Sequence, residues 1–186
     1  MRVSLLEELE PILKHEFPGI KTWRSFAQWW LFAHGLDYRG KEKDYCVDGS
    51  GDGCLDLIAW PLPSFSDKCI RIIQSKFYKN PPKLNNLKRF MEAIEAIKGG
   101  RDQFDLWLDT VSDDLRTTYE KLRDEHSAGK LKFILITTAK LDTDTTKFLL
   151  RKDIEVYEGK NIRQLLKFYN KGQTPRIEKL TLVLST

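Results

Sequence analysis

Apolar residues recur at two different spacings along this chain of 186 residues. In the segment 4–17 they return every three or four positions, which predicts an amphipathic helix with acidic residues on its other side. The segment 22–34 predicts a second helix with a heavy aromatic face, ended by Gly35. The same spacing predicts two further helices over 84–98 and 102–126.

Other segments carry continuous β-branched and aliphatic residues between turn-forming residues, which is the pattern of buried strands. The first two, 49–60 and 70–77, are joined by a proline-containing connection and are expected to pair as an antiparallel hairpin. A third predicted strand, 132–138, opens an alternating series that continues with a helix over 144–152, a strand over 154–157 and a helix over 161–169. Strand–helix–strand connections favour parallel pairing with helices covering the sheet. The expected fold is therefore α/β, with a mixed central sheet in which an antiparallel hairpin leads into parallel strands flanked by helices.

The length is sufficient for one domain with a substantial core, which we expect to span residues 1–172. The segment 173–186 contains one more alternating, strand-like pattern with no predicted partner after it. We interpret this segment as a C-terminal strand or as the start of a further domain.

Composition restricts the function classes only weakly. Hydrophobic residues make up 41% of the chain and charged residues 31%, as in an ordinary globular protein, and the net charge of +4 permits a nucleic-acid partner without requiring one. No apolar run approaches membrane-spanning length, and the first residues lack the pattern of a secretory signal. The three cysteines form no C-x-x-C pair, which fits reduced thiols. These features predict a cytoplasmic protein with no membrane partner.

Three polar residues interrupt the first two predicted strands. Asp56 lies inside an otherwise apolar run, whereas Gln74 and Lys76 close the second run and project from the same face, because side chains alternate along a strand. Hairpin pairing would bring Asp56 to them. A carboxylate, an amide oxygen and an ammonium group together suit a divalent cation and a phosphate, and the Ser75 backbone carbonyl could add a further oxygen ligand.

Simpler interpretations remain open for these residues and their neighbours. Asp56 and Lys76 could form a structural ion pair without catalysis. The glycine-rich stretch 49–53 could form a turn that brings Asp52 or Asp48 near a metal, but an ordinary polar turn explains these two aspartates as well. Ser50 and Asp52 are also candidates for nucleic-acid contact.

Basic and aromatic residues are further candidates for nucleic-acid contact. Lys79 and Lys83 follow the second strand and could track a phosphate backbone, although a solvated surface explains them nearly as well. Trp23, Trp29 and Trp30 could stack on bases. Because Trp29 and Trp30 are adjacent on one helix, we do not expect both to point inward.

The motif Asp-Gly-Ser-Gly-Asp-Gly-x-x-Asp, followed after a gap by Gln-Ser-Lys, resembles the PD-(D/E)xK nuclease superfamily. More narrowly, it is similar to Mrr-like restriction endonucleases and to the N-terminal domain of abortive-infection phage-resistance (AIPR) proteins. The resemblance implies a restriction-endonuclease-like core, with Asp56 as the metal-binding aspartate, Gln74 at the position that holds Glu or Gln, and Lys76 as the catalytic lysine. The chain departs from the family at Cys54-Leu55, where small or branched residues such as Gly-Ile are usual. The change is conservative for packing, but loss of the glycine could constrain the turn.

The resemblance also implies a cofactor, Mg²⁺ with Mn²⁺ as a substitute, held by Asp56, Gln74 and the Ser75 carbonyl. Family members often add an acidic residue from an early helix. Here Glu8 or Glu10 are the candidates, and the neighbouring Glu7 could also substitute.

The function implied by this resemblance is that of a metal-dependent endonuclease that hydrolyses DNA phosphodiester bonds in prokaryotic defence against phage or foreign DNA. Two alternatives stay open: a catalytically inactive nucleic-acid- or protein-binding module of the same fold, and an RNase with the same centre. A homodimer would supply two active sites for two strands, and the sequence leaves the oligomeric state open.

Overall fold

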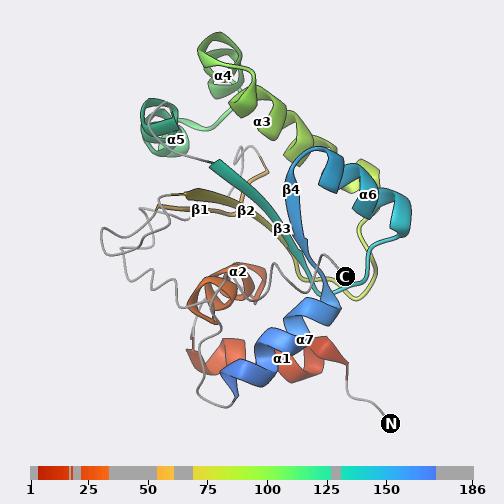
Figure 1. The fold of residues 1–186 in the computed structure, drawn as a ribbon. Coiled ribbons are helices and arrows are strands. Elements are labelled where there is room, and N and C mark those ends of the chain that lie inside the picture. The colour runs from red at the N-terminus through yellow and green to blue at the C-terminus, as the bar shows by residue number, and fades with distance from the viewer. Residues whose placement is uncertain are drawn as a thin grey trace.

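The computed structural model describes residues 4–16, 18, 22–33, 54–60, 69–126 and 131–170, and it leaves the side chains of residues 22–24 and 32 outside that description. Within these residues the fold is α/β, with one mixed sheet between two layers of helices (Figure 1). The elements in chain order are α1 (Leu5–Glu16), α2 (Thr22–Ala33), β1 (Leu57–Ala59), β2 (Ile70–Lys76), the 3-10 helix η2 (Leu84–Leu87), α3 (Lys88–Lys98), α4 (Arg101–Leu108), α5 (Asp113–His126), β3 (Leu131–Thr137), α6 (Thr143–Arg151), β4 (Ile154–Tyr157) and α7 (Gly159–Tyr169).

The described strands lie in the order β1-β2-β3-β4. β1 pairs with β2 in antiparallel fashion, with Leu57 opposite Ile73, whereas β2, β3 and β4 are parallel neighbours. The predicted mixed sheet, a hairpin leading into parallel strands, is thereby confirmed. The carboxyl ends of three strands and the start of β1 meet at one edge of the sheet.

One face of the sheet is covered by α1, α2 and α7 (Figure 1). Along α1 the buried residues Leu5, Leu9 and Leu13 recur every four positions, so that a single stripe faces the core. The helix begins with a reciprocal capping box, in which the Ser4 backbone N–H donates to Glu7 Oε2 at 2.8 Å and the Glu7 N–H donates to Ser4 Oγ at 3.3 Å. These local bonds start α1 beside the carboxyl edge of the sheet, where Leu5 approaches Gly159.

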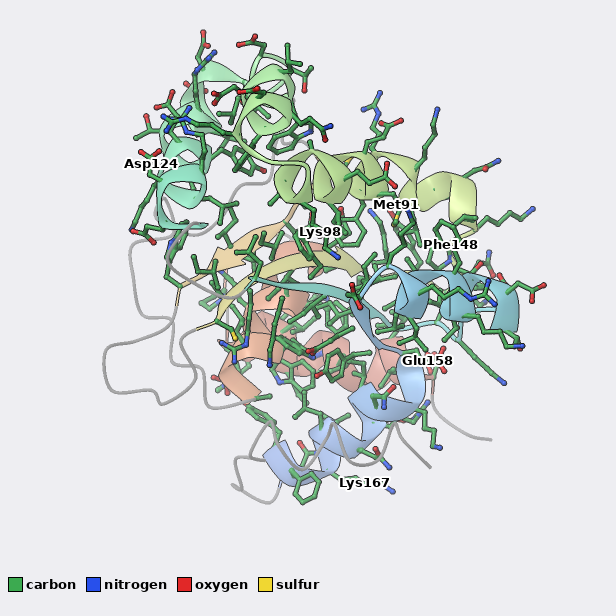
Figure 2. The ribbon with its side chains drawn as sticks, turned by 45° about the horizontal axis from the view of Figure 1, so that its top comes forward. Met91, Lys98, Asp124, Phe148, Glu158 and Lys167 are labelled. Atoms are coloured by element: carbon green, nitrogen blue, oxygen red, sulfur yellow. The ribbon has the colours of Figure 1, made fainter. Side chains whose placement is uncertain are left out.

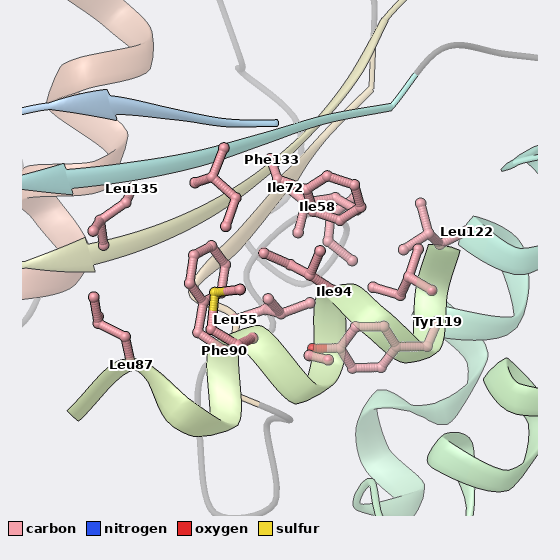
Figure 3. Close-up of a cluster of buried hydrophobic side chains, with 14 of the residues drawn as sticks. Leu55, Ile58, Ile72, Leu87, Phe90, Ile94, Tyr119, Leu122, Phe133 and Leu135 are labelled. Carbon is pink, nitrogen blue, oxygen red and sulfur yellow. The ribbon is translucent and has the colours of Figure 1, made fainter. Parts of the chain in front are cut away.

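The opposite face is covered by α3, α4, α5 and α6 (Figure 1). Figure 3 shows this second core, in which residues from the strands meet α3 and α5. Phe90 and Ile94 of α3 pack towards Ile72 and Phe133 of the sheet, and Tyr119 of α5 closes the cluster. Consecutive apolar residues of β2 point to opposite faces of the sheet, with Ile72 in this core and Ile73 in the other, so β2 is buried on both sides.

The predicted single helix over 102–126 is wrong, because the chain forms α4 and α5 with a break at 109–112. The N–H groups of Thr110 and Val111 donate to the carbonyl groups three residues earlier, and the Thr110 hydroxyl also donates to the Trp107 carbonyl at 2.7 Å. These bonds close α4 in a tight turn. Val111 is buried against the core instead of continuing the helix, and Ser112 precedes the acidic first turn of α5, as is typical of a new helix start.

The expectation that Trp29 and Trp30 could not both be buried is also wrong. Both are almost fully buried, because α2 has apolar neighbours on more than one side: the sheet and the helices of its own layer. Trp29 contacts Tyr169 of α7 edge-on at 5.9 Å between ring centroids, and Trp30 contacts Tyr157 of β4 at 5.1 Å. These two rings are therefore core residues, and the Trp23 side chain lies outside the described residues.

The strand predicted in 173–186 lies outside the described residues. Among the helices that are described, none combines the length and the apolar character needed to span a membrane.

Candidate metal and phosphate site

Asp56 lies immediately before β1, next to the carboxyl end of β2. Its backbone N–H donates to the Ile73 carbonyl at 2.9 Å, which continues the pairing of the hairpin one residue beyond Leu57. The residue is only 6% exposed, so its carboxylate is held inside the protein. The predicted hairpin thus places Asp56 beside Gln74.

The turn before Asp56 carries an unusual backbone conformation. Cys54 has φ +61°, in the left-handed region that favours glycine. A cysteine rather than a glycine adopts this conformation, so the chain accepts a less favourable backbone geometry just before Asp56.

Three donors converge on one oxygen of the Asp56 carboxylate. Oδ2 accepts hydrogen bonds from the Ser75 N–H at 2.5 Å, the Ser75 hydroxyl at 2.7 Å and Gln74 Nε2 at 2.8 Å. Donors around a buried carboxylate offset the cost of removing it from water. Gln74 and Ser75 at the end of β2 thus hold Asp56 in one orientation at the sheet edge.

Only one of the two polar atoms of the Gln74 amide, Nε2, forms hydrogen bonds with described residues. Its Nε2 donates to Asp56 and, at 3.4 Å, to the Ser75 carbonyl, whereas its Oε1 is buried and accepts no hydrogen bond from any described residue. The side chain is only 2% exposed. A buried carbonyl oxygen without a donor is unfavourable, so this atom is a candidate ligand for a cation.

Lys76 lies two residues beyond Gln74 on the same side of β2, the side covered by α3. Among the described residues it forms no ion pair with Asp56 or with any other carboxylate. Its half-buried side chain places Nζ 5.9 Å from the centroid of the Tyr78 ring. A structural Asp56–Lys76 ion pair, one of the open interpretations, is therefore not what the structure contains.

Residues from the end of β3 fix the chain after Lys76. The Thr138 N–H donates to the Lys76 carbonyl at 3.2 Å, and the Thr138 hydroxyl donates to the Tyr78 carbonyl at 2.8 Å. Farther along the same edge, Glu158 lies at the junction of β4 and α7 (Figure 2) and accepts a hydrogen bond from the Leu141 N–H at 2.9 Å. Thr138 and Tyr78 were not among the predicted site residues. Tyr78 could have been found from the sequence, because it lies next to the Gln-Ser-Lys motif. Thr138 could be found only once the pairing register of β3 with β2 was known.

The glutamates of α1 differ in their surroundings. Glu8 pairs with Arg163 of α7, and Glu10 pairs with Lys14 one turn along its own helix at 3.0 Å. Glu7 interacts electrostatically with Lys79. The hydrogen bonds with Ser4 lower the pKa of Glu7, and Lys79 lowers it further. Of these three glutamates, Glu7 is therefore the one that interacts with a charge on the segment following β2.

The predicted nucleic-acid-binding residues divide into two groups. Lys79 and Lys83 are exposed on the segment that follows β2, and Lys79 lines the same surface pocket as Lys76. Ser50 and Asp52 lie outside the described residues.

The oxygen atoms at this site are of the kind that bind a hard cation, but there are few of them. In the part of the chain that the structure describes, no group of three or more His, Cys, Asp or Glu side chains is close enough to hold a metal ion. Asp56, the Gln74 amide and the Ser75 carbonyl supply oxygen atoms, as Mg²⁺ prefers, and Mg²⁺ commonly takes its other ligands from water and substrate phosphate.

Comparisons of the chain with protein-family models, with curated proteins and with solved structures found no match in any of the three.

Proposed function

We propose that this protein is a Mg²⁺-dependent endonuclease that hydrolyses phosphodiester bonds of DNA, with Mn²⁺ able to replace Mg²⁺. The observation that carries the proposal is the buried Asp56–Gln74 pair. The amide oxygen of Gln74 lacks a donor, and two residues later Lys76 has no carboxylate partner among the described residues. The resemblance of this motif to PD-(D/E)xK nucleases supports the same reaction class.

Asp56 and Gln74 would hold the cation. Rotation of the Gln74 amide by half a turn about its last side-chain torsion exchanges Nε2 and Oε1, and this torsion has a broad, nearly two-fold preference. The exchange presents a second oxygen beside the carboxylate in place of the N–H that now donates to it. When bound there, the metal supplies Lewis-acid stabilisation of the phosphate and makes water a stronger nucleophile at neutral pH.

Lys76 contributes positive charge next to this pair. Hydrolysis of a phosphodiester builds negative charge on the phosphoryl oxygens, and a fixed ammonium group in a partly desolvated position stabilises that charge. Its backbone carbonyl is held by Thr138, so the lysine is attached to a fixed part of the sheet edge. Lys79, farther along the exposed segment, can bind the next phosphate of the strand.

The proposal includes a role in prokaryotic defence against phage or foreign DNA and a cytoplasmic location. The two described cysteines, Cys54 and Cys69, are not joined in a disulfide, which suits a reducing compartment.

The test is the nicking of supercoiled plasmid in Mg²⁺ by the wild type and by three variants. Asp56→Asn keeps an oxygen that can accept the Ser75 hydrogen bonds, and Lys76→Met keeps the aliphatic stem of the lysine, so each removes charge with little change of shape. We expect each to lower the nicking rate by about 100- to 1,000-fold. The matched control is Lys132→Met, which removes a lysine that pairs with Glu155 at 3.9 Å elsewhere on the sheet and should leave the rate unchanged.

Equal rates in all four proteins, or no nicking by the wild type with any divalent metal, would contradict the proposal. Binding of DNA without cleavage, unaffected by Mg²⁺, would favour an inactive binding module. Cleavage of RNA but not of DNA would assign the same centre to an RNase.

A further inference from the structure

A surface pocket of about 560 Å³ opens directly beyond the end of β2. It is lined by seven residues of the segment that follows the candidate site: Lys76, Tyr78, Lys79, Asn80, Pro81, Pro82 and Asn86. Its volume falls within the range of small-molecule sites in proteins. Lys76 belongs both to this pocket and to the candidate site, so the two are continuous.

The walls of the pocket are held in place before any ligand binds. The hydroxyl of Thr138, which lies 60 residues away in the sequence and just beyond β3, donates a hydrogen bond to the Tyr78 carbonyl at 2.8 Å. The N–H of Lys83 donates to Asn86 Oδ1 at 2.9 Å, and the N–H of Asn86 donates back to the Lys83 carbonyl at 2.8 Å. Two consecutive prolines between these anchors restrict the backbone further. A pocket organised in this way loses little conformational entropy on binding.

The lining residues provide the groups that recognise a nucleotide. Tyr78 is 51% exposed, so part of the residue is accessible for contact with a base, and Lys76 Nζ lies over its ring at 5.9 Å from the centroid. Lys79 can bind phosphate, and the exposed amides of Asn80 and Asn86 can bond with the edge of a base. An aromatic ring among cationic groups is the common arrangement for binding single-stranded nucleic acid.

We propose that this pocket receives one unpaired nucleotide of the DNA strand, with its base against Tyr78 and its phosphate at Lys76. The inference rests on the proposed function, because it uses the same lysine and the same polymer. A base inside a duplex has both faces covered by its neighbours and must leave the stack before it can lie on a side chain. The substrate class is therefore single-stranded DNA, or duplex DNA with locally unpaired bases.

The test measures binding in the full-length Asp56→Asn protein without divalent metal, so that cleavage plays no part. Fluorescence anisotropy gives the Kd of a labelled 12-nucleotide single strand and of the blunt duplex with the same sequence. We expect the single strand to bind more tightly than the duplex. Adding Tyr78→Ala should weaken single-strand binding by about fivefold to 150-fold, the range found when a stacking aromatic residue is removed, and should leave duplex binding unchanged.

Two further variants separate stacking from charge. Tyr78→Phe keeps the ring and should bind the single strand within about twofold of the parent protein. Lys79→Ala should reduce the slope of log Kd against log salt concentration by about 0.7, the value for one phosphate contact on a single strand, whereas Tyr78→Ala should leave that slope unchanged, because stacking releases no counterions. A merely structural role of Tyr78 would not produce this division.

Single-strand affinity that is no greater than duplex affinity, or that Tyr78→Ala leaves unchanged, would overturn the inference, as would failure of the single strand to bind. If the wild type nicks plasmid but Tyr78 has no effect on binding, only the pocket assignment fails. If the single strand binds in the expected way but no nucleic acid is cleaved, the pocket assignment stands and the nuclease proposal fails.

Discussion

The Gln74 side chain uses its two hydrogen-bonding atoms differently. Nε2 donates to a buried carboxylate, whereas Oε1 is buried without a donor from the described residues. In the absence of a cation, the amide N–H is a neutral group that satisfies part of the charge on Asp56. A glutamine therefore permits the site to fold without metal, whereas a second carboxylate would place two like charges side by side.

This difference gives a prediction for Gln74→Glu. Without divalent metal, the variant should be about 1–3 kcal/mol less stable than the wild type near pH 7, because a hydrogen bond is lost and two buried carboxylates repel one another. Addition of Mg²⁺ should raise the Tm of the variant by more than it raises the Tm of the wild type, since the cation then has two charged ligands. Thermal unfolding with and without Mg²⁺ measures both effects.

The sign of the pH dependence follows from the same repulsion. Repulsion raises the pKa of the introduced carboxyl group in the folded protein above its ordinary value of about 4.3, so the folded state holds that proton more tightly than the unfolded state. The deficit of the variant should therefore shrink as the pH falls through the raised pKa. The matched control is the same change at Gln103, which is exposed on α4 and should show no dependence on Mg²⁺. A Mg²⁺ response of Gln74→Glu no larger than that of the wild type would argue against a shared cation.

At the scale of single elements, α6 shows how one carboxylate defines a helix start. Asp142 precedes the helix, where its Oδ1 accepts the Thr145 N–H at 2.7 Å and its Oδ2 accepts the Thr145 hydroxyl at 2.7 Å. These hydrogen bonds, that from the backbone N–H first, lower the pKa of Asp142 below its ordinary value. The charged form is therefore the one that stabilises the helix.

We predict that Asp142→Ala lowers the Tm at pH 7 and that the difference from the wild type disappears in acid. Because the folded-state pKa is depressed, the contribution of Asp142 is complete above the ordinary value of 3.8 and is lost as the pH falls through the lower folded-state value. Thermal unfolding followed by circular dichroism between pH 7 and pH 2 measures this change. Asp144→Ala, an exposed neighbour in the first turn, is the control and should change the Tm less. A Tm difference that is constant over the whole pH range would refute the assigned role.

Most elements could be predicted from the sequence because their signals are local. Ser4 and Glu7 mark the start of α1, and the apolar run of β2 has the length and composition of a buried strand. The break between α4 and α5 was missed because apolar residues keep helical spacing across it, although Thr110, Val111 and Ser112 carried the signal for a stop and a new start. The periodicity of apolar residues records which side is buried, not whether the helix is continuous.

At the scale of the whole molecule, the predicted α/β class and the order of hairpin and parallel strands followed from the connections. The meeting of Asp56 with Gln74 could also be predicted, since a hairpin brings the start of one strand to the end of the other. The pocket could not be predicted, because its wall depends on the hydrogen bond from Thr138 to Tyr78, which joins segments from different parts of the chain. The burial of both Trp29 and Trp30 likewise depends on how α2 lies between the sheet and its companion helices.

The fold therefore places the proposed cation ligands, the lysine and the pocket at one edge of the sheet. Asp56, just before β1, and the end of β2 supply the proposed cation ligands. β2 also supplies Lys76, and the segment held by Thr138, just after β3, supplies the pocket. We expect Asp56 and Gln74 to hold one divalent cation beside that lysine.

Electron paramagnetic resonance measures Mn²⁺ binding at this pair of residues, because only free Mn²⁺ gives the sharp signal in solution. We expect the wild type to bind Mn²⁺ at this site, Asp56→Asn to weaken the binding by at least about tenfold, and Lys76→Met to retain it. Equal Mn²⁺ binding by the wild type and Asp56→Asn, or no binding by the wild type, would show that Asp56 and Gln74 do not hold a shared cation.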